Sequence, residues 1–219
     1  MRIVGGKNLI HIGKLPRFLF KELTQRVESL TEDDWQPIAR PKGRDVIYFK
    51  YNSEHWNNGE DHYQGRQLDP AQYDNTTIYD AWYDWADILQ PILDHIIEVH
   101  FQGLDVFVNK CFFNRLGPQG LLWPHWDDEP SMAVSKRVHL VVKTHPLVDF
   151  IINENIFHFS EGDLIEIDNI AMHSVKNNSE IWRIHMVMDF YHRNFVNELV
   201  YGRLDRLPNE SKFSLTYVP

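Results

Sequence analysis

Cysteine is almost absent from this sequence, since Cys111 is the single one among 219 residues. One cysteine excludes an internal disulfide framework and suits a reducing compartment. No run approaches the roughly 18 apolar residues of a membrane span, and the amino terminus lacks the apolar segment of a signal peptide. We therefore expect a cytoplasmic chain without a membrane partner, in which Cys111 is a buried structural residue of an apolar strand.

Basic runs are also missing. Acidic residues outnumber basic ones by 31 to 22, which gives a net charge of −9. Because nucleic acids and anionic membranes attract basic surfaces, this balance argues against both as the main partner. We expect no nucleic acid partner.

Apolar and aromatic residues are abundant enough for a sizeable core. Hydrophobic residues make up 43% and aromatic residues 13% of the chain, which excludes a disordered protein. The length suits a single domain. We expect one domain over 1–219, in which a helical and mixed part (1–103) packs on a β core (104–192) that is followed by a carboxy-terminal extension (193–219).

The first hundred residues combine helical periodicity with one polar loop. Apolar residues recur at helical spacing over 16–29 and 80–101, and 44–51 has the composition of a strand. The stretch 53–65 is rich in polar residues and contains His55 and His62, which we expect at the surface. This loop is a candidate to shape a substrate pocket.

Short apolar runs separated by turn signals dominate the chain after Gly103. Seven such strands in close succession indicate a β-sandwich, jelly roll or barrel. The predicted strands are 104–113, 132–142, 148–152, 155–159, 163–167, 171–175 and 181–191.

Two histidines and one aspartate form a candidate metal site. His125 and Asp127 lie two positions apart, and in extended chain such residues point to the same side. With the distant His173 they complete a set of two histidines and one carboxylate, the arrangement used for non-haem Fe(II). Three protein ligands on one face of an octahedron leave room for a bidentate 2-oxo acid and for O₂.

Charged residues inside apolar strands predict an anion-binding wall beside this site. Arg183 and His185 alternate with apolar residues over 181–191. A buried arginine without a partner is costly, and a dicarboxylate cosubstrate would supply a bidentate one. Over 136–143, Arg137 and His139 share a face, which places two more donors near the predicted metal.

Several motifs together resemble the aspartyl/asparaginyl β-hydroxylase family of Fe(II)- and 2-oxoglutarate-dependent oxygenases, which includes small proline hydroxylases. They extend from about residue 105 to 192 and follow one another in the family's order. The matching segments are WPHWD (123–127), RVHLVVK (137–143), FSEGDLIEIDNIAMHSVKN (159–177) and WRIHMVMDFYH (182–192).

The resemblance implies a mainly β fold with N-terminal helices on a double-stranded β-helix core, the jelly roll shared with cupins. It implies Fe(II) and 2-oxoglutarate as cofactors, and no catalytic residue beyond the metal ligands. The residues implied are His125, Asp127 and His173 as ligands of Fe(II), Arg183 at the distal carboxylate of 2-oxoglutarate, Arg137 and His139 at its iron-proximal end, and Asn114 as a further polar contact.

The expected reaction is hydroxylation of a C–H bond of an amino acid or amino-acid side chain by O₂, with succinate and CO₂ as coproducts. The substrate is a small molecule or a peptide segment. Two alternatives stay open from the residues alone. One is a cupin-like hydrolase or isomerase that uses the same ligands with another metal, and the other is a jelly-roll binding module without enzymatic activity.

Overall fold

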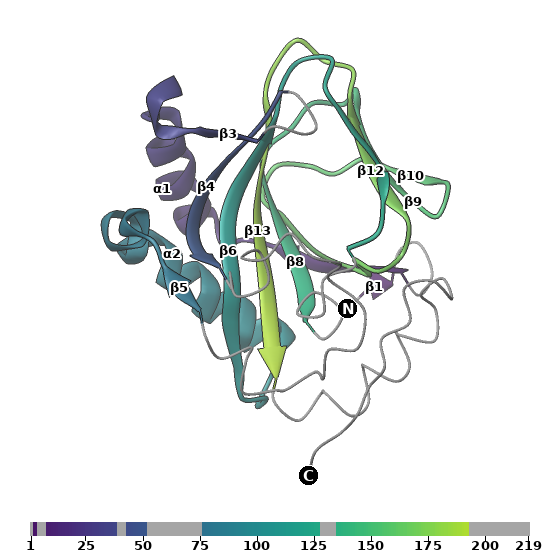
Figure 1. The fold of residues 1–219 in the computed structure, drawn as a ribbon. Helices are drawn as coiled ribbons and strands as arrows, with labels where there is room; N and C mark the ends of the chain where they lie inside the picture. The colour runs from purple at the N-terminus through teal and green to yellow at the C-terminus, as the bar shows by residue number, and fades with distance from the viewer. Residues whose placement is uncertain (1, 4–7, 39–42, 52–75, 128–134, 193–219) are drawn as a thin grey trace, which may run out of the picture.

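The computed structural model describes residues 2–3, 8–38, 43–51, 76–127 and 135–192. Two antiparallel sheets face each other, and two α-helices cover the outer side of the larger sheet (Figure 1). This arrangement confirms the predicted mainly β architecture with N-terminal helices. The expectations for 53–65, with His55 and His62, and for 193–219 lie outside the described residues.

The larger sheet carries the charged wall expected from the sequence. Its strands follow the order β1-β2-β11-β8-β13-β6-β4-β3, and β5 pairs with β4. They are β1 (Arg2–Ile3), β2 (Leu9–Lys14), β3 (Gln36–Ile38), β4 (Arg44–Tyr51), β5 (Thr77–Ile78), β6 (Val106–Leu116), β8 (Lys136–Lys143), β11 (Asp163–Ile167) and β13 (Arg183–His192).

The smaller sheet carries the predicted histidine ligands. Its order is β10-β9-β12-β7, and it appears on the right in Figure 1. Apolar side chains of both sheets, among them Leu116, Phe150 and Val175, form one cluster between them. Its strands are β7 (Leu121–His125), β9 (Val148–Ile152), β10 (Asn155–Phe157) and β12 (His173–Asn177).

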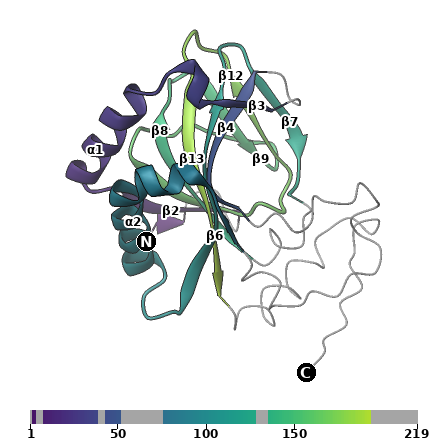
Figure 2. The same ribbon diagram turned by 60° about the vertical axis from the view of Figure 1, so that its left-hand side comes forward.

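Both helices place one apolar face on the larger sheet. Helices α1 (Arg17–Glu28) and α2 (Asp80–His100) bury Leu23 and Leu89 completely, and α2 continues through Pro91. A fully buried leucine contributes about 1.5–3 kcal/mol, so these contacts hold the helices on the sheet (Figure 2). None of the described helices is both long and apolar enough to cross a membrane.

An ionic cluster fastens the end of α2 to the sheet. His100 lies 2.5 Å from the Glu166 carboxylate on β11, and Lys136 on β8 donates to the same carboxylate over 2.8 Å. Both His100 and Glu166 are buried. Three elements are therefore joined at one carboxylate on the side of the sheet that faces the helices.

The strands of the larger sheet alternate between a helix-facing and a cavity-facing side. On β13, Ile184, Met186 and Met188 pack in the core beneath the helices, whereas Arg183 lines the opposite side. This is the alternation expected for 181–191. The observed bounds differ by a few residues from those predicted, since β6 continues to Leu116 and β12 begins at His173.

Candidate active site

Strand pairing brings the predicted metal ligands together from distant parts of the chain. His173 on β12 pairs directly with His125 at the end of β7. Asp127 follows two residues later, and its backbone N–H donates to the Asn169 carbonyl over 2.9 Å. The turn before β12 therefore holds the carboxylate next to both rings.

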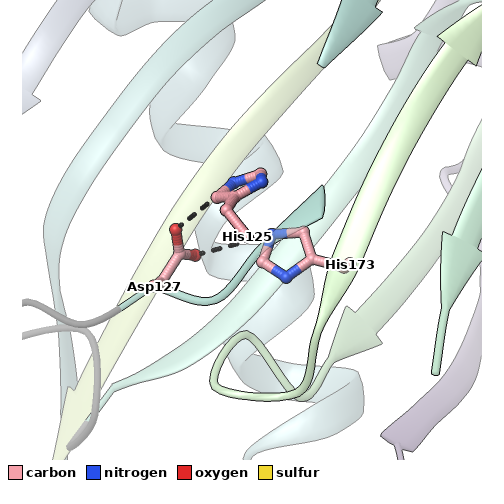
Figure 3. Close-up of side chains that lie close together, drawn as sticks. All are labelled: His125, Asp127 and His173. Atoms are coloured by element: carbon pink, nitrogen blue, oxygen red, sulfur yellow. Dashed lines mark ion pairs between the residues drawn. The ribbon is translucent and has the colours of Figure 1, made fainter. Parts of the chain in front are cut away.

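The three side chains form one potential metal site (Figure 3). One ligand atom from each lies within 4.8 Å of the others. The Asp127 Oδ1 atom is 3.8 Å from His125 Nε2, and its Oδ2 atom is 3.9 Å from His173 Nε2. Two imidazole nitrogens and one carboxylate make up the donor set expected for non-haem Fe(II).

Backbone carbonyls fix which nitrogen of each ring is available to a metal. His125 Nδ1 donates to the Trp123 carbonyl over 2.7 Å, and His173 Nδ1 donates to the Ala171 carbonyl over 2.9 Å. A carbonyl only accepts, so both protons sit on Nδ1 and both Nε2 lone pairs face Asp127. Burial also lowers the pKa of His173. The donor set therefore suits a divalent cation.

Arg137 links the metal carboxylate to a second aspartate. Its Nε and Nη2 donate to the two oxygens of Asp189, each over 2.7 Å, and its Nη1 contacts Asp127. Burial alone would raise the pKa of Asp127, but the charge of Arg137 outweighs it and lowers that pKa to about 2. Asp127 is therefore ionised and oriented.

A cavity of about 620 Å³ lies between the two sheets beside this cluster. His125, Asp127 and His173 line it together with Arg137, His139 and Arg183. All of the predicted site residues, including Asn114, thus border one space. A volume of this size holds a small cosubstrate and a small substrate together.

Arg183 reaches this cavity without a carboxylate partner. It is 2% exposed, its Nη2 donates to His185 Nδ1 over 2.6 Å, and its Nε has no hydrogen-bond partner. Within the parts of the chain that the structure describes, no carboxylate forms an ion pair with it. Burial, together with the charge of Arg44, lowers the pKa of Arg183 to about 9.

A chain of hydrogen bonds runs from Arg183 through His185 to His139. Arginine only donates, so His185 Nδ1 accepts, and His139 Nδ1 at 3.3 Å from it is the second donor. Burial and the charge of Arg183 hold the pKa of His139 well below its usual range. The buried Nε2 of His139 therefore has neither a proton nor a hydrogen-bond partner.

Two residues in or next to the site were not predicted from the sequence. Asp189 shares the Arg183 face of β13, so strand alternation in 181–191 was a signal that could have found it. Arg44 begins β4, whose residues are buried on both sides, so periodicity did not reveal that it faces the cavity.

The sequence matches the family model described as aspartyl/asparaginyl β-hydroxylase over residues 81–193, more than half of the chain. The chain belongs to the aspartyl/asparaginyl β-hydroxylase family. Membership confirms the predicted class, an Fe(II)- and 2-oxoglutarate-dependent oxygenase, and with it the two cofactors. A hydrolase or isomerase and a non-enzymatic module are set aside accordingly.

Solved structures of low sequence identity share the jelly-roll fold. A 2OG-Fe(II) oxygenase from Burkholderia pseudomallei has a TM-score of 0.55 at 12% identity, covering 86% of this chain and 85% of its own. A Trichoplax adhaerens prolyl hydroxylase, bound to a hypoxia inducible factor peptide, scores 0.51 at 12% identity, with 87% and 85% covered.

HygX from Streptomyces hygroscopicus, solved with nickel, 2-oxoglutarate and hygromycin B, has a TM-score of 0.52 at 8% identity, with 84% of this chain and 81% of its own covered. At such identities the likeness concerns the fold, and the predicted jelly-roll core is confirmed. A comparison with curated protein sequences gives no significant match.

Proposed function

We propose that this oxygenase hydroxylates a C–H bond of an amino acid or an amino-acid side chain, with succinate and CO₂ as coproducts. The observation that carries this proposal is the buried Arg183, which lines the cavity that also contains the triad and forms no ion pair with any carboxylate of the described residues. A dicarboxylate fits a cavity that combines a buried arginine with a candidate metal site.

Each predicted residue then has a place in the reaction. His125, Asp127 and His173 would hold Fe(II), which would activate O₂ for oxidation of the C–H bond. Arg183 would bind the distal carboxylate of 2-oxoglutarate, and Asn114, which pairs with His185 in the sheet register, would support that contact. We assign the iron-proximal end of 2-oxoglutarate to His139 and Arg137.

Arg137 has a positioning task in addition. Its bonds to Asp189 and Asp127 orient the metal carboxylate before any ligand arrives. When Asp127 turns its oxygens to the metal, the Nη1 donor of Arg137 becomes available to the cosubstrate. Apolar residues such as Phe150 and Val187 line the same cavity and exclude water from it.

The test follows conversion of 2-oxoglutarate to succinate in protein supplied with Fe(II) and ascorbate. Wild-type protein should form succinate, and His125→Ala should not. Arg183→Gln should weaken 2-oxoglutarate binding about tenfold or more, because a charge-assisted bidentate pair is lost. Calorimetry with anaerobic Mn(II)-loaded protein measures this dissociation constant directly.

The control is Arg17→Gln, which removes the same charge from an exposed position at the start of α1. Unchanged 2-oxoglutarate affinity in Arg183→Gln would contradict the assigned carboxylate site. Absence of any product heavier than its substrate by one oxygen atom, across free amino acids and peptides, would contradict hydroxylation.

A further inference from the structure

Arg44 is a second cavity arginine without an acidic partner. It lies at the start of β4, is partly buried, and lines the same cavity as the triad. Its Nε donates to Asn114 Oδ1 over 3.3 Å. Among the residues that the structure describes, no carboxylate forms an ion pair with Arg44. Burial lowers its pKa, which shows that the charge is poorly solvated.

The sheet register places Arg44 and Arg183 at the same level of the cavity. Both pair with Leu116 on β6, Arg44 from one side and Arg183 from the other. Neighbouring strands are about 4.8 Å apart, so the two backbones are separated by roughly 10 Å. The charge of Arg44 lowers the pKa of Arg183, so the two cations disfavour each other. An anion bound between them would stabilise both.

Other buried arginines of the sheet already have their counterions. Arg115 binds Glu32 and Asp45 on the helix-facing side, and Arg137 binds Asp127 and Asp189. Two unmatched cations on one cavity exceed what the distal carboxylate of one 2-oxoglutarate molecule needs. With Arg183 assigned to the cosubstrate, Arg44 remains for a second anionic group.

The wall of the same cavity also carries a patch of aromatic rings. Tyr48, Tyr51, Tyr79 and Phe112 line it, and Tyr48 lies four residues after Arg44 on β4. Tyr48 stacks on Tyr79 with ring centroids 5.6 Å apart and contacts Phe112 at 5.7 Å. A single guanidinium and a patch of rings in one cavity fit a singly charged carboxylate attached to an apolar or cyclic body.

We propose that Arg44 binds the carboxylate of the primary substrate, and that this substrate is a free amino acid with an apolar or cyclic side chain. The inference rests on the proposed function, because it assumes that Arg183 is used by 2-oxoglutarate. The cavity of about 620 Å³ must contain both molecules, which also favours a small substrate. A residue inside a polypeptide chain has no free α-carboxylate to offer.

The test compares free L-amino acids with their carboxamides, which keep the side chain and lose the negative charge. Calorimetry is done under anaerobic conditions on protein loaded with Mn(II) and 2-oxoglutarate. At least one apolar or cyclic amino acid should bind, and its carboxamide should bind about tenfold more weakly or worse. Arg44→Gln should reduce the affinity for the acid to that for the amide.

Matched variants separate this effect from loss of the fold. Arg17→Gln should bind both probes as wild type does, and Arg44→Lys, which keeps the charge, should recover part of the preference for the acid. Arg44→Gln should retain 2-oxoglutarate affinity within about twofold, whereas Arg183→Gln should not.

Three results would overturn the inference. They are equal binding of acid and amide, equal loss of 2-oxoglutarate affinity in the Arg44 and Arg183 variants, and binding only by peptides with blocked ends. No binding by any amino acid would count against it as well. Failure of 2-oxoglutarate to bind wild-type protein would instead contradict the proposed function, so the two outcomes are distinguishable.

Discussion

At the scale of single residues, the lone pair of His185 Nδ1 determines which ring nitrogen of His139 carries the proton. His185 Nδ1 accepts from both Arg183 and His139, which leaves His139 with a bare Nε2. A bare nitrogen repels a carboxylate, so His139 needs a proton before it can contact the proximal end of 2-oxoglutarate. The charge of Arg183 is one of the causes that lower the pKa of His139. A carboxylate bound beside Arg183 would offset this charge and favour protonation of His139.

We therefore predict that 2-oxoglutarate binding takes up a proton at His139. In the free protein the pKa of His139 is well below 6.5, so the ring is neutral at pH 7, and a bound dianion raises that pKa. Affinity should then fall as the pH rises through the bound-state pKa. Binding heats in two buffers of different ionisation enthalpy measure the uptake.

The control for this prediction is His139→Gln, which keeps a polar side chain that does not titrate. Its binding heat should not depend on the buffer. Buffer-independent heats in wild-type protein would show that His139 stays neutral and does not meet a carboxylate.

At the scale of elements, the turn between β6 and β7 sets the position of the first histidine. The Gly120 N–H donates to the Gly117 carbonyl over 3.0 Å, and the Gly120 carbonyl accepts from Asn177 on β12 over 2.9 Å. This tight turn starts β7 in register with β12, and the register places His125 opposite His173.

Gly120→Ala should destabilise this turn. A Cβ atom at this position would lie 2.8 Å from the Gly117 carbonyl oxygen and 2.8 Å from Leu116 Cδ1, so the backbone has to shift. We expect a loss of about 1–3 kcal/mol in the free energy of unfolding, measured by urea denaturation. Metal affinity should fall with it, because β7 holds His125. A variant as stable as wild type would show that the turn is free to relax.

The orientation of side chains on each strand was only partly predictable from the sequence. Alternation in 181–191 predicted that Arg183 and His185 face away from Ile184 and Met186, and the structure has this arrangement. The three candidate metal ligands could be proposed from the sequence because each lies in a short local motif, and the structure places their side chains together. Arg44 could not, since β4 is buried on both faces and its orientation depends on the pairing with β6. The bond between Arg137 and Asp189 joins residues 52 positions apart, which no local pattern encodes.

At the scale of the whole molecule, the candidate metal site lies at a contact between the two sheets. His125 and His173 belong to the smaller sheet, whereas Asp127 contacts Arg137 of the larger one. A bound metal would link His125 and Asp127, at and just after the end of β7, to His173 on β12, next to the ion pair that joins Asp127 to the larger sheet. Ligands that bind only the folded state stabilise it by mass action.

Mn(II) should therefore raise the melting temperature. At a free concentration 100 times the dissociation constant, the gain is about 2.7 kcal/mol, which corresponds to several degrees in a chain of this size. His173→Ala should show no metal-dependent shift in differential scanning calorimetry. His158→Ala, the same substitution at an exposed histidine outside the triad, should shift as wild type does. A shift in His173→Ala equal to that of wild type would locate the metal elsewhere.

The contacts of Arg137 bear on how the enzyme can be made and stored. Asp127 is already paired with this arginine before any metal is bound, so this carboxylate is not an isolated buried charge in the apoprotein. Folding and metal loading are then separate events, unlike those of small zinc domains that unfold when the ion is removed. A chelator should strip the protein reversibly and leave a folded apoprotein, which can be purified in air and charged with fresh Fe(II) only at the moment of assay.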